Sequence, residues 1–142
     1  MLSPVEDKLA ILRAVPLFAD LDERSLQAVA ILAHEATFRA GDVLMVEGEP
    51  GETFYVVVDG TVRIEQGDRT VRSLTAGGFL GEIALVERRP RTATATCVTD
   101  ARLLELRAHE FERLLESLPA VHDRISSAIL RRERMSPRAG SL

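Results

Sequence analysis

The chain has 142 residues, of which 46% are hydrophobic and 28% charged, and its net charge is −4. This length suits one domain with its own hydrophobic core, and the hydrophobic fraction excludes a disordered protein. The single cysteine, Cys97, excludes a disulfide scaffold and a cysteine-based zinc site, and the negative net charge argues against a general nucleic-acid-binding protein.

The N-terminal part of the chain has helical periodicity. Apolar residues in Val5–Ala14 recur at roughly the helical period, and Pro16 ends this segment. A second helix is predicted from Glu23 to about Ala33, because Asp22 is a favourable N-cap residue that can accept hydrogen bonds from the first helical turn.

From Ala36 the pattern changes to short apolar stretches separated by glycine-containing turns. Many short strands at even spacing are typical of a barrel or jelly roll, also called a double-stranded β-helix. The expected strands are Asp42–Val46, Phe54–Val58, Thr61–Glu65, Thr70–Leu74, Ala93–Val98 and Arg102–Leu106.

The last part of the chain is again helical, with helices predicted over Ala108–Leu118 and Ala120–Met135 and a frayed tail over 137–142. The predicted fold class is therefore α+β, a β-barrel flanked by N-terminal helices and two C-terminal helices. We expect residues 1–142 to form a single domain, with helices at about 5–34, the barrel at about 36–106 and the C-terminal helices at about 108–135.

The second C-terminal helix carries an apolar stripe that allows three interpretations. Its members are Val121, Ile125, Ala128 and Ile129. The stripe could pair with a second copy in a homodimer, fold over a pocket as a lid, or pack on the barrel. We favour the homodimer through this helix.

Residues 78–97 combine features of an anion site with a carboxylate. Backbone donors at Ile83 and Ala84 would open a helical turn, and such a terminus attracts anions. Arg91 adds a guanidinium, which can donate two parallel hydrogen bonds to a phosphate. Because the carboxylate of Glu82 repels phosphate, we expect it to face a hydroxyl group. Together these residues indicate a phosphate joined to a ribose.

Two motifs in this order resemble the cyclic nucleotide-binding domain family, as found in the sensor domain of regulators similar to catabolite activator protein. The phosphate-binding cassette reads Gly81-Glu82-Ile83-Ala84-Leu85, then five residues, then Arg91-Thr92-Ala93. The preceding hairpin motif reads Gly48-Glu49-x-Gly51-x-x-Phe54-Tyr55-Val56-Val57-x-x-Gly60. The resemblance covers about 17–134, with Met45 as a minor departure from the second motif.

The resemblance implies roles for the cassette residues. Glu82 would accept a hydrogen bond from the ribose 2′-OH, and Arg91 would neutralise the cyclic phosphate. Backbone N–H groups of Ala84 and Thr92 would bond the exocyclic oxygens, while Gly81 would allow close approach to the sugar. The ligand-binding set is Gly81, Glu82, Ile83, Ala84, Arg91, Thr92, Ala93 and Ser136.

Two of these residues bear on the choice of base. Thr92 suits guanine, whose 2-amino group a hydroxyl can bond, but family members that bind cAMP carry serine there. Ser136, at the end of the last helix, is placed near the base by the resemblance. We expect cAMP as the ligand in preference to cGMP, and no other cofactor.

The sequence predicts no metal site and no enzyme. His34, His109 and His122 share no ligand spacing, and no Ser/His/Asp arrangement supports catalysis. The longest apolar run, Ala28–Ala33, has six residues, whereas a membrane span needs about 20, so we expect a cytoplasmic protein.

Only eight residues follow Arg134, so we expect no DNA-binding domain on this chain. The expected function is that of a stand-alone sensor, in which the ligand closes the cassette, the C-terminal helices move and a protein effector detects that movement. The alternative is a protein-interaction module whose pocket is idle or holds another ligand.

Overall fold

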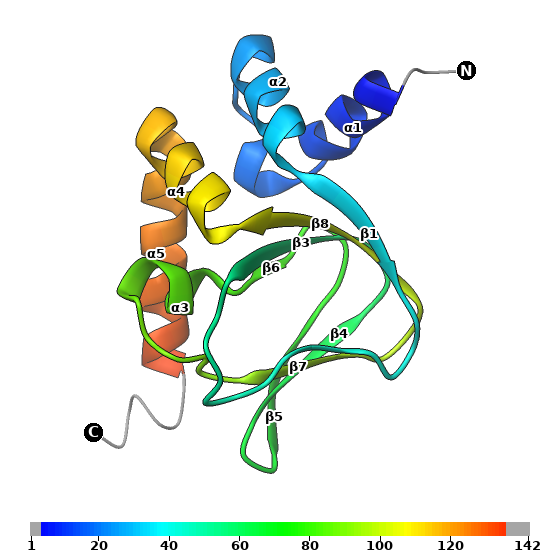
Figure 1. Ribbon diagram of the computed structural model, residues 1–142, viewed down its shortest axis with the longest axis vertical. Helices are drawn as coiled ribbons and strands as arrows, with labels where there is room; N and C mark the ends of the chain where they lie inside the picture. The colour runs from blue at the N-terminus through cyan, green and yellow to red at the C-terminus, as the bar shows by residue number, and fades with distance from the viewer. Residues whose placement is uncertain (1–3, 136–142) are drawn as a thin grey trace.

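Two four-stranded antiparallel sheets form the barrel of the computed structural model, which describes residues 4–135 (Figure 1). The strands are β1 (His34–Phe38), β2 (Val43–Met45), β3 (Thr53–Asp59), β4 (Val62–Gln66), β5 (Arg69–Leu74), β6 (Phe79–Leu80), β7 (Thr94–Cys97) and β8 (Ala101–Arg107). The first sheet has the order β1-β8-β3-β6 and the second has the order β2-β7-β4-β5. The fold is the jelly roll that the sequence predicts.

Helices surround the first sheet on its outer side and at its ends (Figure 1). They are α1 (Pro4–Arg13), the 3-10 helix η1 (Pro16–Phe18), α2 (Glu23–Leu32), α3 (Glu82–Glu87), α4 (Ala108–Ser117) and α5 (Pro119–Met135). Asp22 is the N-cap of α2 as predicted, since its carboxylate accepts a hydrogen bond of 2.8 Å from the backbone N–H of Ser25. This hydrogen bond lowers the pKa of Asp22.

The central strands of the first sheet, β3 and β8, are buried on both faces because their residues alternate between two hydrophobic clusters. On β3, Phe54 and Val56 face the helices, whereas Tyr55 and Val57 face the interior of the barrel. We call these two regions the helix-side cluster and the barrel interior. The second sheet encloses the barrel interior from the opposite side.

The strand β1 lies two residues closer to the N-terminus than the barrel region that the sequence predicts. It begins at His34 and pairs with β8, with His34 opposite Glu105. Its side chains are exposed or half-buried, so the segment lacks the apolar alternation that marks a strand in sequence. The prediction of helix up to about residue 34 is therefore wrong at its end, because α2 ends at Leu32.

The apolar stripe on α5 packs inside the chain. Val121, Ile125, Ala128 and Ile129 are all at most 5% exposed, and three of them belong to the helix-side cluster. The packing interpretation is therefore correct for this stripe, and our preference for a dimer contact through these side chains is wrong because other residues of the same chain already cover them. A homodimer through α5 would have to use its outward side chains.

Arg124 connects α5 to the 3-10 helix η1, which lies more than 100 positions earlier in the chain. Its guanidinium donates hydrogen bonds to the carbonyl oxygens of Leu17 at 2.7 Å and Pro16 at 3.3 Å, and to the carboxylate of Asp20 at 2.8 Å. The N-terminal and C-terminal helices are therefore joined by polar contacts as well as by apolar packing.

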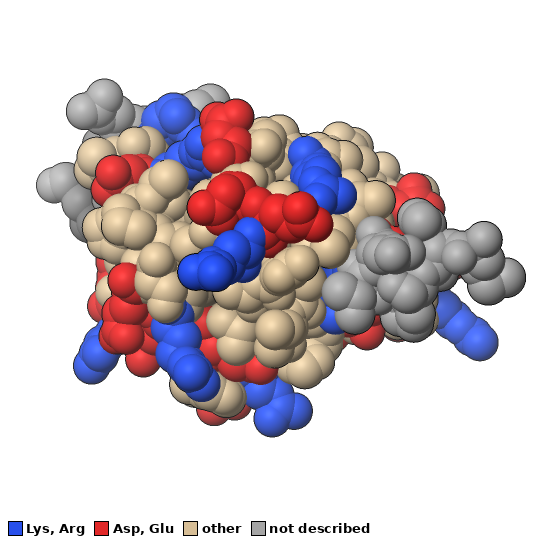
Figure 2. Space-filling model, turned by 90° about the horizontal axis from the view of Figure 1, so that it is seen from above, with Lys and Arg blue, Asp and Glu red and all other residues tan. Residues whose placement is uncertain are grey.

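The surface of the helical end carries both signs of charge. Figure 2 shows acidic and basic side chains lying next to one another on this face. Such mixing differs from the basic face that nucleic-acid-binding domains present. Among residues 4–135, no helix combines the length and the apolar composition that crossing a membrane requires.

Candidate functional site

Glu82 lies at the first position of α3 and is almost completely buried, with 1% of its surface exposed. The preceding residue, Gly81, has a φ of 95°, a left-handed conformation that favours glycine. A Cβ atom at Gly81 would also lie 2.6 Å from the carbonyl oxygen of Thr53. Glycine at this position is therefore required for the tight turn that places Glu82.

Arg91 is the second buried charged residue of the site, with 6% of its surface exposed. Its Nη2 donates a hydrogen bond of 2.7 Å to the carbonyl oxygen of Thr53, and its Nη1 donates one of 3.1 Å to that of Gly81. Burial lowers the pKa of Arg91, and the charges of Tyr55 and Glu82 partly oppose this effect. An arginine remains protonated at neutral pH, so a cation is held in place here.

The backbone of Arg91 is fixed by the first residues of the hairpin motif, which lie before β3. The N–H of Arg91 donates to the carbonyl oxygen of Glu49 at 2.8 Å, and the N–H of Gly48 donates to the carbonyl oxygen of Arg91 at 2.9 Å. A further hydrogen bond of 3.0 Å joins the N–H of Glu47 to the hydroxyl of Thr94. The two sequence motifs are therefore in direct contact.

The remaining cassette residues lie around this pair. Ala84 is buried on α3, Ile83 packs against the helix-side cluster, and Ala93 is part of the barrel interior. Thr92 is half-buried, and its carbonyl oxygen accepts a hydrogen bond of 2.9 Å from Nε2 of Gln66. The structure thus brings together all the predicted site residues except Ser136, which lies outside the described residues.

Sequence reasoning missed two residues that contact the site. Gln66 holds the backbone at Thr92 from the neighbouring strand, and nothing in its local sequence marks it. Gly51 lies against the guanidinium of Arg91. Its place in the hairpin motif was a signal, but only the three-dimensional contact shows what it touches.

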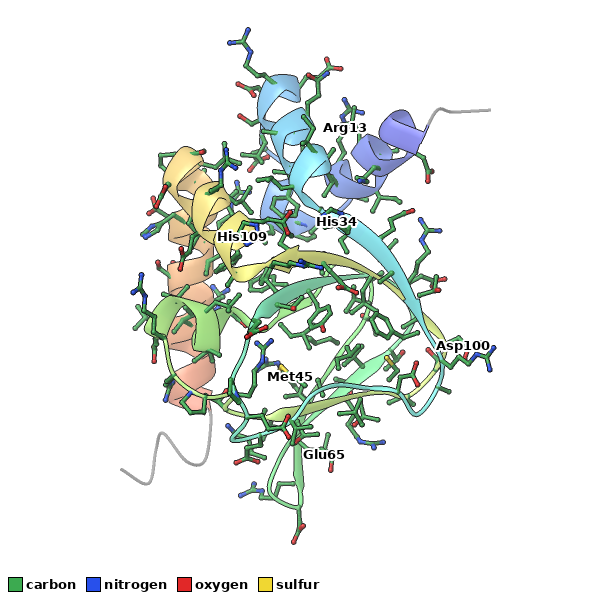
Figure 3. The ribbon with its side chains drawn as sticks, in the orientation of Figure 1. Arg13, His34, Met45, Glu65, Asp100 and His109 are labelled. Carbon is green, nitrogen blue, oxygen red and sulfur yellow. The ribbon has the colours of Figure 1, made fainter. Side chains whose placement is uncertain are left out.

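A separate hollow of about 500 Å³ is lined in part by Asp42 and Asp100. Figure 3 shows Asp100 at the end of the barrel away from α3. The two carboxylates that line the hollow accept backbone hydrogen bonds: Asp42 from Arg39 at 2.8 Å, and Asp100 from Ala40 at 2.9 Å. These bonds shape the turn between β1 and β2. Across the part of the chain that the structure describes, no three His, Cys, Asp or Glu side chains gather as metal ligands would.

The structure is a jelly-roll domain whose cassette holds two buried charged residues, Glu82 and Arg91. A family model described as cyclic nucleotide-binding domain matches residues 35–118. The chain belongs to this family, which consists of regulatory nucleotide-binding domains.

Three relatives illustrate the range of the family. A cyclic nucleotide-gated potassium channel of Rhizobium etli is 34% identical over 128 residues, which are 90% of this chain and 36% of the channel. The solved structure of Sp-2Cl-cAMPS bound to PKAR CBD2 has 25% identity and a TM-score of 0.85, and the match covers 97% of this chain and 95% of that one. The catabolite activator protein of Thermus thermophilus has 27% identity and a TM-score of 0.76, with coverage of 84% and 58%.

The chain spans about a third or less of the length of the curated relatives that it matches first. The similarity therefore concerns the binding domain and not the channel or kinase parts of those proteins.

Proposed function

We propose that this chain binds a cyclic nucleoside monophosphate, cAMP in preference to cGMP, and transmits its occupancy through the C-terminal helices to a protein effector in the cytoplasm. The observation that carries the proposal is the buried guanidinium of Arg91, fixed by two backbone carbonyl groups beside the buried carboxylate of Glu82. A fixed cation stabilises a phosphate without first being ordered by it.

The two charged groups have complementary parts in this proposal. Arg91 has five N–H donors, of which the structure assigns two to Gly81 and Thr53, so others are left for phosphate oxygens. Glu82 accepts a hydrogen bond from the ribose 2′-OH, and backbone N–H groups of Ala84 and Thr92 bond the exocyclic oxygens. The side chains of Ile83 and Ala93 keep the cassette packed, and Ser136 is proposed to approach the base.

The preference for cAMP rests on the relatives, because Thr92 does not decide between the two bases. A hydroxyl at this position serves both bases, so it does not by itself select guanine. The solved relative with 25% identity carries Sp-2Cl-cAMPS, a cAMP-type ligand. This supports cAMP as the first nucleotide to test.

The signalling part of the proposal follows from the packing of α3. Leu85 and Ile83 contact the helix-side cluster, which also contains Ile125 and Ile129 of α5. A ligand that draws Glu82 toward Arg91 would move α3 within this cluster. The helices would then have two arrangements, one with and one without ligand. The ligand can shift the equilibrium between them only if it binds one arrangement more tightly than the other.

The test is isothermal titration of the purified chain with cAMP and with cGMP, repeated with Arg91→Ala. We expect micromolar or tighter binding of cAMP and weaker binding of cGMP. Arg91→Ala should lose roughly 3–5 kcal/mol of binding free energy, because it leaves a buried phosphate without its counter-charge. The matched control is Arg89→Ala, since Arg89 lies in the same loop with its side chain 43% exposed and paired with Glu87.

Two outcomes would contradict the proposal. If Arg91→Ala bound cAMP with unchanged affinity, Arg91 would not bind the phosphate and the assigned site would be wrong. The absence of heat and of a thermal shift with either nucleotide would favour the protein-interaction alternative, to be pursued by affinity capture. Hydrogen exchange with and without cAMP tests the signalling part, which fails if residues 119–135 exchange identically in both.

A further inference from the structure

Gly51 lies directly against the side chain of the buried arginine. A Cβ atom built on Gly51 would lie 2.6 Å from Nε, 2.7 Å from Cζ and 2.9 Å from Cδ of Arg91. All three distances are shorter than a carbon atom makes with a non-bonded neighbour. Any side chain at position 51 would therefore require Arg91 to move.

A second glycine limits the guanidinium from another direction. A Cβ atom on Gly81 would lie 2.8 Å from Nη1 of Arg91, and the carbonyl oxygen of Gly81 accepts a hydrogen bond from the same nitrogen. The two glycines and the carbonyl oxygen of Thr53 leave a narrow space, which we call the arginine slot. Its walls are made of backbone, so the guanidinium has little freedom to tilt.

A substitution would have different consequences at the two glycines. Gly81 has a φ of 95°, so a substitution there strains the backbone as well as the slot. Gly51 is not among the residues with positive φ, so alanine there avoids the left-handed strain that it would meet at Gly81. The contact with Arg91 is therefore the main effect expected of Gly51→Ala in the folded state, which makes this substitution a specific probe.

We propose that Gly51 is a positioning residue for ligand binding: by lacking a side chain, it lets Arg91 reach the carbonyl oxygens of Thr53 and Gly81 and so sets the plane of the guanidinium. The slot is a property of the chain without ligand. Its consequence for affinity rests on the proposed function, in which Arg91 binds the phosphate of a cyclic nucleotide.

A double-mutant cycle in urea tests the slot without any ligand. The four chains are the unsubstituted protein, Gly51→Ala, Arg91→Ala and the double variant. We expect Gly51→Ala to lower the folded-to-unfolded ratio about tenfold when Arg91 is present, and less than about threefold when Arg91→Ala has emptied the slot. Additive effects would overturn the proposal. If Gly51→Ala folds only together with Arg91→Ala, the same coupling is shown.

Gly41→Ala is the control, at a glycine outside the cassette and the hairpin motif. Gly41 has a φ of 93°, and no heavy atom lies within 4 Å of the position that a Cβ atom would take there. Its substitution should therefore cost the same whether Arg91 or alanine stands at position 91. Coupling of Gly41 to Arg91 as strong as that of Gly51 would overturn the proposal, since it would reflect a general loss of stability.

Titration with cAMP tests the consequence for binding. Gly51→Ala should weaken cAMP binding at least about tenfold at a temperature where the variant is folded, whereas Gly41→Ala should stay within about threefold. Unchanged affinity in Gly51→Ala would overturn the positioning role. If the unsubstituted chain does not bind cAMP, the proposed function fails, and the ligand-free cycle still decides whether the slot exists.

Discussion

The helix-side cluster and the barrel interior lie on opposite faces of the same strands, but they connect different parts of the molecule. The barrel interior joins strand to strand across the two sheets, whereas the helix-side cluster gathers side chains from α1, η1, α2, α3, α4 and α5 onto the first sheet. The cassette lies on the boundary between them. Leu85, near Glu82, packs in the helix-side cluster, and Ala93, near Arg91, packs in the barrel interior.

This difference indicates how a small ligand could produce a large response. A ligand that contacts both Glu82 and Arg91 joins a group carried by the helices to a group carried by the barrel. Changes in the distance between those groups are resisted by packing on one side and by hairpin hydrogen bonds on the other. In the proposed function, the barrel would be the fixed reference and the helices would be the part that responds.

The largest expected effects come from shortening one buried leucine in each cluster. Leu103 faces the barrel interior and Leu114 faces the helices, and both are at most 1% exposed. Each substitution by alanine should lower the free energy of unfolding by about 2–5 kcal/mol, because each leaves a cavity. Urea unfolding measures this loss.

Hydrogen exchange of α5 separates the two leucine variants. Leu114→Ala should reduce the cAMP-dependent change in exchange over residues 119–135, while Leu103→Ala should leave it in place. Equal reductions in both variants would show that the two clusters do not differ in their coupling to the site.

An intermediate effect is expected from Arg124, which ties α5 to η1 within the helical region. Arg124→Ala should cost roughly 1.5–3 kcal/mol of unfolding free energy, since it removes charge-assisted hydrogen bonds to two carbonyl oxygens. Asp20→Ala is the control, because Asp20 is 84% exposed and its ion pair should contribute at most about 1 kcal/mol. If both variants lower the unfolding free energy equally, the hydrogen bonds from Arg124 to the two carbonyl oxygens do not stabilise the fold.

The smallest effect concerns Asp22 at the start of α2. Its pKa is lowered by the backbone and side-chain hydrogen bonds from Ser25, so the ionised form stabilises the folded state. This contribution is present above the ordinary pKa of 3.8 and is lost as the pH falls through the lowered value. Asp22→Asn keeps a capping oxygen but does not titrate, so stability measured below pH 3.8 should depend less on pH. An unchanged acid profile would exclude this role.

Local patterns were enough to predict the parts of the fold and site that depend on neighbouring residues. The cap at Asp22 depends on a contact three positions away, and the cassette from Gly81 to Ala93 is a compact sequence motif. The jelly roll followed from the repeated short strands and glycine turns. These features are encoded within a few residues, so sequence spacing reveals them.

Features that depend on distant residues were not predictable in this way. Arg124 looks like a solvent-exposed helix residue until η1, more than 100 positions away, is placed beside it. Gly51 and Gln66 acquire their roles only when the hairpin and β4 are brought next to the cassette. The apolar stripe on α5 had a clear helical period, but this period does not reveal whether residues of the same chain or of a second chain cover the stripe.

The pairing of β1 with β8 also sets an order for folding. Residues 34–38 lie against residues 101–105, so the first strand has no partner until more than 60 further residues have been synthesised. Until then Leu26 and Val29 of α2 lack Leu104 and Leu106 of β8, which belong to the same hydrophobic cluster. Closing so long a loop is slow, because its entropy is lost before the contacts form. The helices that precede the barrel in sequence are therefore expected to complete their docking only after β8 has paired with β1.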